Sequence, residues 1–506
     1  MRVLLIDPPF YRLIGFYNRY FPLGLVSIGT TLHEAGHTVV VYDADANDRP
    51  SAMDYTRLPD YYPAYLETFR QADHPVWQEM QETIRRFEPD LIGISIWTTY
   101  AASALHVADL CKTVRPDCPV VMGGPHATVR AEEVLRIAPA VDYVVRGEGE
   151  AALLELVEAV GGGPSGIDRI KGLSYRTDGT VVHNSTREMM RDHDSLPMPD
   201  RTLLVNRDTY SSEDMGLIMT SRGCPFSCAF CATETRQVRY RSIEQVIEEI
   251  RHVKVVYGTT QFSFKDDSFT VNRKRVLEFC EALEREDLRI GWECNTRVDL
   301  VTDELLTAMR RAGCNSIKIG IESGSQDVLN RMSKRITLEQ IRRAAALLRK
   351  SGIHWTGYFL IGTPGETVED LAMTLDFVRE IRPDFASVGV YEPFPGTAMF
   401  EEGLKRGLVK PDMAREEFLA VPPNDYYKVD ARRQVDTIDQ EQFQRMEREM
   451  KGRLHAYNRG FGRLLKKAQS RARLYRGEPA LLLTDFRKYL SWNWTGRSDD
   501  AFDSHR

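Results

Sequence analysis

The first 160 residues alternate short, almost continuous apolar runs with longer segments of helical periodicity. The apolar runs, which predict strands, cover residues 2–7, 38–43, 90–96, 119–122 and 142–145. The helical segments cover residues 23–35, 76–87 and 101–114, whereas residues 45–75, rich in Pro, Tyr and Asp, predict an irregular excursion. Uninterrupted apolar strands separated by helices are typical of a parallel, doubly wound sheet. We therefore expect an α/β domain at residues 1–160.

A connector and a second alternation follow. The connector, residues 161–210, begins with a Gly-rich break and contains a predicted hairpin around Asp178 and Gly179. From Gly216 onward, apolar strands are predicted at residues 217–221, 261–265, 290–295, 316–321, 354–361 and 385–391. Helices are predicted at residues 242–256, 272–285, 302–312, 338–351 and 367–381. This pattern predicts a second α/β domain at residues 211–400.

Residues 401–506 are expected to form a mainly helical C-terminal domain. Residues 441–476 have helical character, and from Lys451 to Arg476 there are nine Lys or Arg and no acidic residue. Such a basic face suits a membrane surface or an anionic substrate, although a solvated helix is the ordinary interpretation. Trp492 and Trp494 are candidates for packing on the second domain or for lining a substrate entrance.

Composition narrows the class of protein only a little. The 506 residues include 67 Lys and Arg against 73 Asp and Glu, a net charge of −6, which does not indicate nucleic acid as a partner. No apolar run approaches the ~18 residues that span a bilayer, and the first residues predict a strand and turn and not a signal peptide. Eight cysteines in a chain of this length are no disulfide framework. We expect a cytoplasmic protein.

The strongest chemical signal is a loop with three closely spaced cysteines. Cys224, Cys228 and Cys231 have C-x3-C-x2-C spacing and follow a short apolar run. Three thiolates so close in sequence can bind one iron–sulfur cluster only from a loop that wraps it, and Gly223 and Pro225 suit such a loop. Three ligands leave one iron of the cluster open. A zinc site is the alternative, but it would want a fourth Cys or His, and no His follows within twenty residues of Cys231.

This cysteine loop resembles that of radical S-adenosylmethionine (SAM) enzymes. In that family the open iron of the 4Fe-4S cluster binds the amino and carboxylate groups of SAM, and an electron from the cluster cleaves SAM to a 5′-deoxyadenosyl radical. The resemblance also implies that the six predicted strands form a partial (β/α)6 barrel, whose lateral opening suits a large substrate. A reducing compartment, which we expect for this chain, is where such a cluster survives.

The resemblance assigns SAM contacts to the ends of the predicted strands. Asp266 would contact the amino group of SAM, Arg297 its carboxylate and Glu322 the ribose hydroxyls, while Gly362 and Pro364 belong to the turn near the adenine. Ordinary interpretations remain open for each. The acidic pair 266–267 precedes a helix that Asp267 or Ser268 could cap. Arg297 could instead pair with Glu293 or Asp299, and Gly362 and Pro364 could have a purely conformational role.

The loops at the carboxyl ends of the first domain's strands suit a bulky ligand, because ligands of such sheets bind there. They cover residues 7–10, 95–100, 123–126 and 146–149, and none contains the G-x-G-x-x-G dinucleotide fingerprint. Gly123-Gly-Pro-His126 and Arg146-Gly-Glu-Gly149 resemble the Rossmann-like cobalamin-binding domain of cobalamin-dependent radical SAM enzymes. That resemblance extends from residue 1 to about residue 400. The cobalamin contacts it implies are Ser95, Trp97, Thr98, Tyr100, Gly123, Gly124, Pro125, His126, Gly147 and Glu148.

The chain departs from many cobalamin proteins at the lower axial ligand of cobalt. The Asp-x-His-x-x-Gly motif is absent, so we expect cobalamin to be bound without that histidine, its lower face met by water, Trp97 or Tyr100. For His126 we favour a hydrogen bond to the backbone or to the cofactor's periphery over cobalt ligation. Trp97 could equally be a packing residue at a domain interface.

The other cysteines predict a single cluster. Cys111 and Cys118 lie in the first domain, and no cysteine follows Cys314, whereas further clusters would need a Cys-rich C-terminus. Cys294 lies on the third strand of the second domain, which would place it near SAM. For Cys294 we nevertheless favour the role of a small buried hydrophobic residue.

The resemblance implies an enzyme, most simply a methyltransferase that moves a methyl group from methylcobalamin to an unactivated carbon of a small-molecule substrate, such as a secondary metabolite or a lipid-like compound. An electron donor such as flavodoxin or ferredoxin would be a partner. A cobalamin-dependent radical reaction without methylation, such as oxidative cyclisation or ring contraction, is the alternative within the family. A tRNA methylthiotransferase and a non-catalytic cobalamin or redox sensor are alternatives from other classes.

Overall fold

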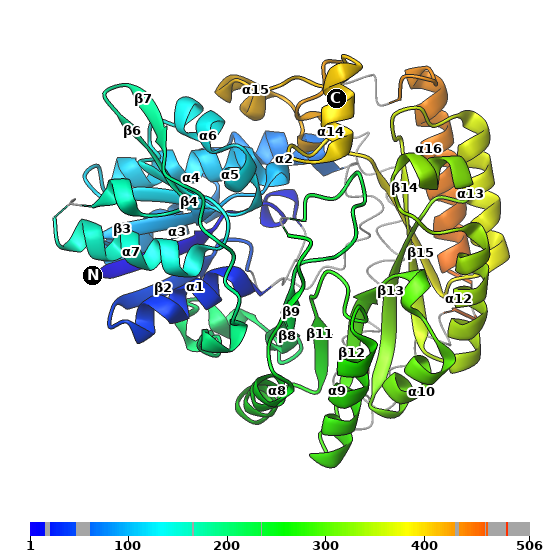
Figure 1. The fold of residues 1–506 in the computed structure, drawn as a ribbon. Helices are drawn as coiled ribbons and strands as arrows, with labels where there is room; N and C mark the ends of the chain where they lie inside the picture. The colour runs from blue at the N-terminus through cyan, green and yellow to red at the C-terminus, as the bar shows by residue number, and fades with distance from the viewer. Residues whose placement is uncertain are drawn as a thin grey trace. The chain divides into compact units, whose positions relative to one another are not determined.

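The structure is a computed structural model that describes residues 1–15, 21–46, 61–163, 166–233, 235–430, 435–460, 462–463 and 482–483. Its contacts group the chain into two compact units (Figure 1). Unit one comprises Met1–Asp48, Asp60–Ser211 and Glu392–Val429, and unit two comprises Arg49–Pro59, Ser212–Tyr391 and Asp430–Arg506. Neither unit is therefore a single continuous segment of the sequence.

Unit one is built on a seven-stranded sheet with strand order β2-β1-β3-β4-β5-β6-β7. Its first five strands are parallel and confirm the predicted doubly wound sheet. They are β1 (Arg2–Asp7), β2 (Thr38–Asp43), β3 (Leu91–Ser95), β4 (Val120–Gly123) and β5 (Tyr143–Val145). The hairpin expected in the connector adds the antiparallel strands β6 (Leu173–Thr177) and β7 (Thr180–His183) to this sheet. Asp178 and Gly179, both at positive φ, form its turn.

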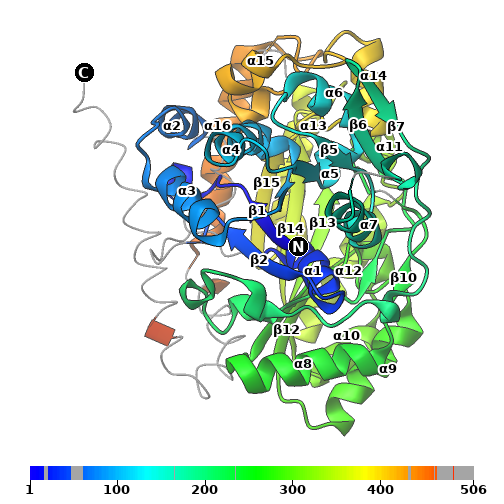
Figure 2. The same ribbon diagram turned by 90° about the vertical axis from the view of Figure 1, so that its left-hand side faces the viewer.

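Helices cover both faces of this sheet. Helices α1 (Leu23–Glu34) and α7 (Gly149–Gly161) pack together on one face, and α3 (Pro75–Phe87) and α4 (Ala101–Val114) pack together on the other (Figure 2). Short helices α5 (Pro125–Val129) and α6 (Ala131–Ile137) follow β4. Because both faces are covered, the strands bury almost every side chain, as their continuous apolar runs predicted.

The excursion expected at residues 45–75 is not irregular throughout. Residues Tyr62–Phe69 form helix α2, and residues 47–60 lie outside the described part of the chain. The buried positions of α2 are Tyr62, Tyr65 and Phe69, and the Tyr65 hydroxyl lies 2.7 Å from the Ser103 Oγ. Aromatic rings with a polar tip can be core residues once the hydroxyl finds a partner. The sequence prediction missed this helix because its apolar surface comes from tyrosines.

The segment Glu392–Val429, which follows the last strand of unit two, belongs to unit one. It contains helices α14 (Ala398–Lys405) and α15 (Arg415–Ala420). Tyr427 donates its hydroxyl to Glu133 at 2.8 Å, Arg415 pairs with Asp109, and Phe418 is fully buried. A separate C-terminal domain was expected from residue 401, whereas the contacts group residues up to Val429 with the first sheet.

Replacing Phe418 with Ala is expected to destabilise unit one by about 3–5 kcal/mol, because a fully buried ring leaves a cavity. Urea unfolding followed by circular dichroism measures this loss. Val205→Ala is the matched control, since Val205 is more than half exposed and its loss should cost less than about 0.5 kcal/mol. Equal effects of the two variants would contradict a packing role for Phe418.

Unit two is built on a six-stranded sheet with order β15-β14-β13-β12-β11-β8, in which neighbouring strands are parallel. The strands are β8 (Leu217–Ile218), β11 (Gln261–Phe264), β12 (Gly291–Thr296), β13 (Cys314–Glu322), β14 (His354–Ile361) and β15 (Phe385–Val390). The first and last strands of this order are not paired with each other, so the sheet is open, as a partial barrel requires. A short ribbon of β9 (Ser221–Arg222) and β10 (Arg239–Tyr240) lies beside the cysteine loop in sequence.

Helices line the outer side of this curved sheet (Figure 1). They are α8 (Ile243–Tyr257), α9 (Arg273–Arg285), α10 (Asp303–Arg311), α11 (Gln326–Arg331), α12 (Leu338–Ser351), α13 (Val368–Ile381) and α16 (Gln440–Asn458). Asn272 caps α9, so the alternative that Asp267 or Ser268 caps this helix is wrong. At the C-terminal end of α16, Asn458 bonds both the N–H and the C=O of Ala386 and thereby docks the helix on edge strand β15.

Two expectations for the C-terminal region concern residues that the structure does not describe. Trp492, Trp494 and most of the basic stretch after residue 463 lie outside the described residues. In the described part of the chain, no helix has the length and apolarity needed to cross a bilayer.

An aromatic layer lies between the sheet and helix α9. Phe264, Phe269, Phe279 and Trp292 contact one another with ring centroids 5.1–5.7 Å apart. Cys294 shares the buried face of β12 with Trp292 and neighbours the buried thiols of Cys280 and Cys314. The interpretation of Cys294 as a small buried hydrophobic residue is therefore confirmed, because strand alternation turns it to the helix-covered face and not toward SAM.

Candidate functional site

The three predicted cluster ligands lie on one half-exposed loop that begins just after β9. Cys224, Cys228 and Cys231 are all free thiols. Gly223 has φ +95°, and a Cβ there would lie 2.4 Å from the Gln237 carbonyl oxygen, so the loop depends on glycine at this point. The Cys224 N–H donates to the Thr235 carbonyl at 3.1 Å, and the Ala229 N–H donates to the Met332 carbonyl at 2.8 Å. These bonds fix the two ends of the loop that carries the thiols.

Arg297 lies against this loop. Its guanidinium donates to the Cys228 Sγ at 3.5 Å and to the Lys334 carbonyl at 2.8 Å, and it stacks 3.7 Å from the centroid of the Phe226 ring. It also pairs with Asp299, whereas Glu293 pairs with Lys318. Of the two alternative partners, Asp299 is therefore the one that Arg297 contacts. Arg297 thus links the cysteine loop to the segment around Lys334.

The donor set fits a 4Fe-4S cluster held by three cysteines. Burial raises the pKa of the Cys224 thiol, and the neighbouring Asp267, Cys231 and Cys228 raise it further, so the three sulfurs lie close together. Within the described ranges, no group of three or more His, Cys, Asp or Glu side chains is close enough to hold a single metal ion. An iron–sulfur cube separates its ligand sulfurs more widely than a single ion does, which suits this arrangement.

Asp266, one of the predicted SAM contacts, is almost fully buried and its carboxylate accepts three hydrogen bonds. These come from the Thr220 N–H at 2.7 Å, the Thr220 hydroxyl at 2.6 Å and the Ser221 hydroxyl at 2.6 Å. Asp266 thus anchors the segment that leads into the cysteine loop. The neighbouring Asp267 is exposed and receives a hydrogen bond from the Gly223 backbone, so it is the carboxylate that faces the loop surface.

Glu322 ends β13 with φ +70°, an uncommon conformation for a residue other than glycine. Its carboxylate lies 2.6 Å from the Lys334 Nζ, and both side chains are at most 10% exposed. A Cβ at Gly320 would lie 2.3 Å from the Glu322 Oε1, so the carboxylate folds back over this glycine. The sequence analysis missed Lys334, because its place in the short connection between α11 and α12 gave no local signal.

Replacing Lys334 with Met is expected to cost about 3–5 kcal/mol of unfolding free energy, because it leaves the buried Glu322 carboxylate without its cation. Denaturant titration measures the loss. The matched control is Lys350→Met, whose partner Asp303 is 57% exposed and whose removal should cost less than about 1 kcal/mol. If both variants lost the same small amount, the Lys334–Glu322 pair would not be a structural element of this strand end.

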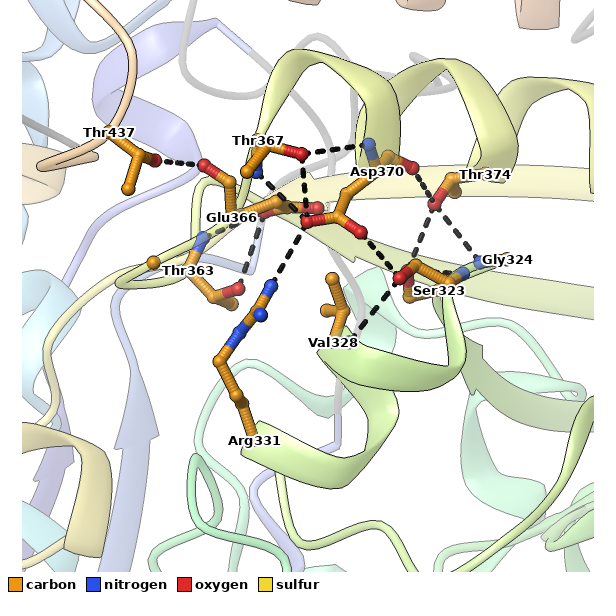
Figure 3. A network of polar contacts seen from close by, with 12 residues as sticks. Ser323, Gly324, Val328, Arg331, Thr363, Glu366, Thr367, Asp370, Thr374 and Thr437 are labelled. Carbon is orange, nitrogen blue, oxygen red and sulfur yellow. Dashed lines mark hydrogen bonds and ion pairs between the residues drawn. The ribbon is translucent and has the colours of Figure 1, made fainter.

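The turns after β13 and β14 are joined through the start of α13 (Figure 3). Asp370 accepts from Ser325, Thr367 and Arg331, and these contacts hold its pKa below the ordinary value although burial opposes them. Thr374 donates to the Asp370 carbonyl and accepts from the Gly324 N–H. A Cβ at Gly324 would lie 2.6 Å from the Met373 carbonyl oxygen, so only glycine allows this close approach.

Gly362 and Pro364 lie in a buried turn after β14. Gly362 has φ +81°, and its N–H donates to the Glu366 carboxylate at 2.6 Å. The Thr363 N–H donates to the same carboxylate at 3.0 Å, while Thr437 donates to the Glu366 carbonyl (Figure 3). Burial raises the pKa of Glu366 to about 7, against these hydrogen bonds. The turn is thus fixed from inside unit two, and the glycine is needed for its backbone conformation.

In unit one, a cavity of about 590 Å³ lies at the carboxyl ends of β1, β3 and β4. Seven of the ten predicted cobalamin contacts line it: Ser95, Trp97, Tyr100, Gly123, Gly124, Pro125 and Gly147. A Cβ at Gly124, where φ is +109°, would lie 3.0 Å from the Ile96 carbonyl oxygen, and Trp97 is half exposed at the rim. A mainly apolar cavity with glycine at its wall fits a large flat cofactor.

The other three predicted contacts do not line the cavity. His126 is buried, its Nδ1 lies 3.1 Å from the Thr98 hydroxyl, and its ring packs on Phe418 and Tyr427. Burial and the nearby Arg130 lower the pKa of His126 to about 3, so the imidazole is neutral. Glu148 accepts from the Met190 N–H at 2.8 Å. The loops of the cavity are thus held by contacts of Thr98, His126 and Glu148 outside its lining.

Three acidic residues, Asp7, Asp43 and Asp45, belong to the lining of this cavity. Asp7, the last residue of β1, lies in the loop at residues 7–10 that the sequence analysis selected, whereas Asp43 and Asp45 were missed. Asp43 is the last residue of β2, so the rule that ligands bind at strand carboxyl ends could have selected it too.

Comparison with known proteins decides the family. The Radical SAM superfamily model matches residues 218–378, and the B12 binding domain model matches residues 13–157. An uncharacterised methyltransferase of Pyrococcus horikoshii is 33% identical over 418 residues, which cover 81% of this chain and 84% of the relative. The chain belongs to the cobalamin-binding radical SAM enzymes. It is therefore an enzyme that uses a 4Fe-4S cluster, SAM and cobalamin.

Two further relatives delimit what the family membership implies. The anaerobic magnesium-protoporphyrin IX monomethyl ester cyclase of Rubrivivax gelatinosus is 35% identical over 334 residues, 64% of this chain and 60% of the cyclase. The radical SAM methyltransferase TsrM of Kitasatospora setae, solved with cobalamin and a [4Fe-4S] cluster, superposes with TM-score 0.64 at 19% identity over 81% of this chain and 76% of TsrM. At that identity, the TsrM structure supports the fold of this cobalamin-binding radical SAM enzyme.

Proposed function

We propose that this enzyme transfers a methyl group to an unactivated carbon of a small-molecule substrate. The observation that carries the proposal is the methyltransferase of Pyrococcus horikoshii, whose similarity extends over 81% of this chain and so includes both cofactor domains. When bound, the cluster and SAM supply a radical and cobalamin supplies the methyl group. The protein's own share is to bind, orient and exclude water.

The proposed roles of individual residues follow from where they lie. Cys224, Cys228 and Cys231 bind the cluster, and Arg297, beside Cys228, holds the loop and offers a cation to the SAM carboxylate. Asp266 acts by positioning the strand end, and the exposed Asp267 is better placed than Asp266 to meet the SAM amino group. Glu322 is the candidate for the ribose hydroxyls, and Gly362 and Pro364 shape the turn proposed to lie near the adenine.

In unit one, the cavity residues are proposed to hold cobalamin. Ser95, Tyr100, Gly123, Gly124, Pro125 and Gly147 form its wall, and Trp97 is the side chain proposed for the lower face of cobalt. His126 is excluded from cobalt ligation in this proposal, because it is buried behind the wall against Phe418. Thr98 and Glu148 position the loops.

A radical reaction without methylation is the second candidate, favoured by the 35% identity to the cyclase of Rubrivivax gelatinosus. Turnover with methyl-labelled SAM separates the two. Methylation requires label in the product, whereas product without label, formed together with 5′-deoxyadenosine, would establish the alternative and exclude methyl transfer.

Partners beyond the substrate are proposals from the sequence. A flavodoxin or ferredoxin would supply the electron that the cluster needs, and the basic stretch from Lys451 to Arg476 would allow peripheral membrane contact. A cytoplasmic location agrees with eight cysteines that form no disulfide framework.

A further inference from the structure

The cavity of unit one has an unusual distribution of charge. Among the described residues that line it, the charged ones are all acidic: Asp7, Asp43 and Asp45. They come from the ends of β1 and β2; Asp43 and Asp45 are buried, whereas Asp7, which also lines the cavity, is partly exposed. Three ionised carboxylates side by side in a mainly apolar cavity repel one another, which favours a proton on at least one of them.

Two of these carboxyls serve the protein's own backbone. Asp45 accepts from the Phe10 N–H at 2.7 Å and the Arg12 N–H at 2.9 Å, and so fixes the loop after β1. Asp43 accepts from the Asp45 N–H at 2.8 Å and from the Tyr210 hydroxyl. Hydrogen bonds from N–H and O–H donors favour the ionised state of the acceptor. Arg12, a described cation close to Asp43, forms its ion pair with Glu79 at 2.6 Å.

The Asp7 carboxyl has weaker hydrogen bonding than those of Asp43 and Asp45. Its carboxyl has a long hydrogen bond of 3.5 Å from the Tyr100 hydroxyl, and it faces the other two acids of the cavity. Burial raises the pKa of Asp7 well above its usual value, and the charges of Asp43 and Asp45 raise it further, against the small effect of Tyr100. Burial also raises the pKa of Asp43 to about 6 and that of Asp45 to about 7. Asp7 has the weakest hydrogen-bond support of the three and is therefore the carboxyl best suited to hold the proton.

We propose that Asp7, as a neutral carboxylic acid, binds a primary amide at the periphery of cobalamin and positions the cofactor in this cavity. A neutral carboxyl offers one O–H donor and one C=O acceptor, which complement the C=O and NH₂ of a primary amide. The edge of the corrin ring carries several such amides. The same acidic wall excludes the cofactor's single anion, its phosphodiester, from this end of the cavity. The inference rests on the proposed placement of cobalamin in unit one.

Equilibrium binding of methylcobalamin to the full-length protein in the dark tests the assignment, with the dissociation constant measured from about pH 5 to about pH 9. Methylcobalamin is the suitable probe because its axial ligands do not titrate over this range. Asp7 keeps its proton below its raised pKa and loses it above, so wild-type affinity should be constant at low pH and fall by about tenfold as pH rises.

Three variants separate Asp7 from its neighbours. Asp7→Asn keeps an amide donor and acceptor without a titratable proton, so its affinity should stay within about twofold of the wild-type value at low pH and should lose most of the wild-type change with pH. Asp7→Leu should bind about tenfold more weakly at every pH. The control Asp142→Asn, an acid at the amino end of β5 that accepts from the Val120 N–H, should keep the wild-type profile. Circular dichroism confirms that each variant is folded.

The outcomes distinguish a wrong role for Asp7 from a wrong placement of cobalamin. A pH-dependent loss of affinity that persists in Asp7→Asn would assign the titration to Asp43 or Asp45 and overturn the proposal. Wild-type affinity in Asp7→Leu, or a flat wild-type profile, would overturn it as well. Absence of methylcobalamin binding by the wild-type protein at every pH would instead refute the placement of cobalamin in unit one.

Discussion

Cys228→Ala is expected to abolish cleavage of SAM while leaving unit one able to bind cobalamin. Each of the three loop thiols is a required ligand, because a 4Fe-4S cluster that keeps one iron open for SAM needs a cysteine on each of its other three irons. Cys228 is also the thiol that Arg297 contacts, at 3.5 Å. Since the side chain is half exposed, its truncation should change the free energy of unfolding by less than about 1 kcal/mol.

Iron content, cluster absorbance and 5′-deoxyadenosine formation after anaerobic reconstitution measure the effect. The variant should lose most of its iron and form no detectable 5′-deoxyadenosine. Cys294→Ala is the matched control, because this thiol lies on the helix-covered face of β12, and the variant should retain its iron and its SAM cleavage. A fully loaded, active Cys228→Ala enzyme would refute the assignment of the loop.

Asp266→Ala is expected to destabilise unit two by about 3–5 kcal/mol and to lower cluster incorporation at the same time. The substitution removes the acceptor of three buried hydrogen bonds from Thr220 and Ser221, and each donor left without a partner costs about 1–3 kcal/mol. The hydroxyls can turn to other acceptors but the Thr220 N–H cannot. Thr220 and Ser221 lie directly before the loop, so loss of order at these residues should also displace Cys224 from its position as a cluster ligand.

Urea unfolding and iron analysis of the same preparations test the two effects together. Asp267→Ala is the control for stability, since the exposed neighbour should cost less than about 1 kcal/mol. Asp267→Ala should instead weaken SAM binding if Asp267 is the carboxylate that meets the amino group. A stable Asp266→Ala protein with weakened SAM binding would mean that Asp266 touches SAM itself and that its role is not the positioning proposed above.

The sequence predicts the local elements of both sheets well, because their signals are local. Strand β14 and helix α12 have the predicted bounds: the first is a continuous apolar run, and the second is an amphipathic segment that begins after Thr337, whose capping box with Gln340 sets its start. The cysteine loop was recognised for the same reason, since its spacing alone limits the metal centres it can bind.

Features that depend on distant partners could not be predicted. The sequence cannot show that the Asp266 carboxylate accepts hydrogen bonds from Thr220 and Ser221, nor that Glu322 pairs with Lys334. These partners have no fixed spacing in the sequence. The orientation of Cys294, by contrast, can be read from the sequence, because Glu293 and Asn295 alternate with Trp292 and Cys294 along β12 and so place Cys294 on the face of Trp292. Helix α2 was missed because tyrosines supply much of its buried surface.

Because Glu392–Val429 belongs to unit one, this unit cannot be isolated by cutting the chain at a single point. A fragment ending near residue 211 would contain every strand of the first sheet, yet it would lack Phe418 and Tyr427, which cover His126. Such a fragment would present an apolar face to water and would be prone to aggregation. A soluble cobalamin module is better sought by genetic fusion, with residues 392–429 joined through a flexible linker to residue 211, than by truncation.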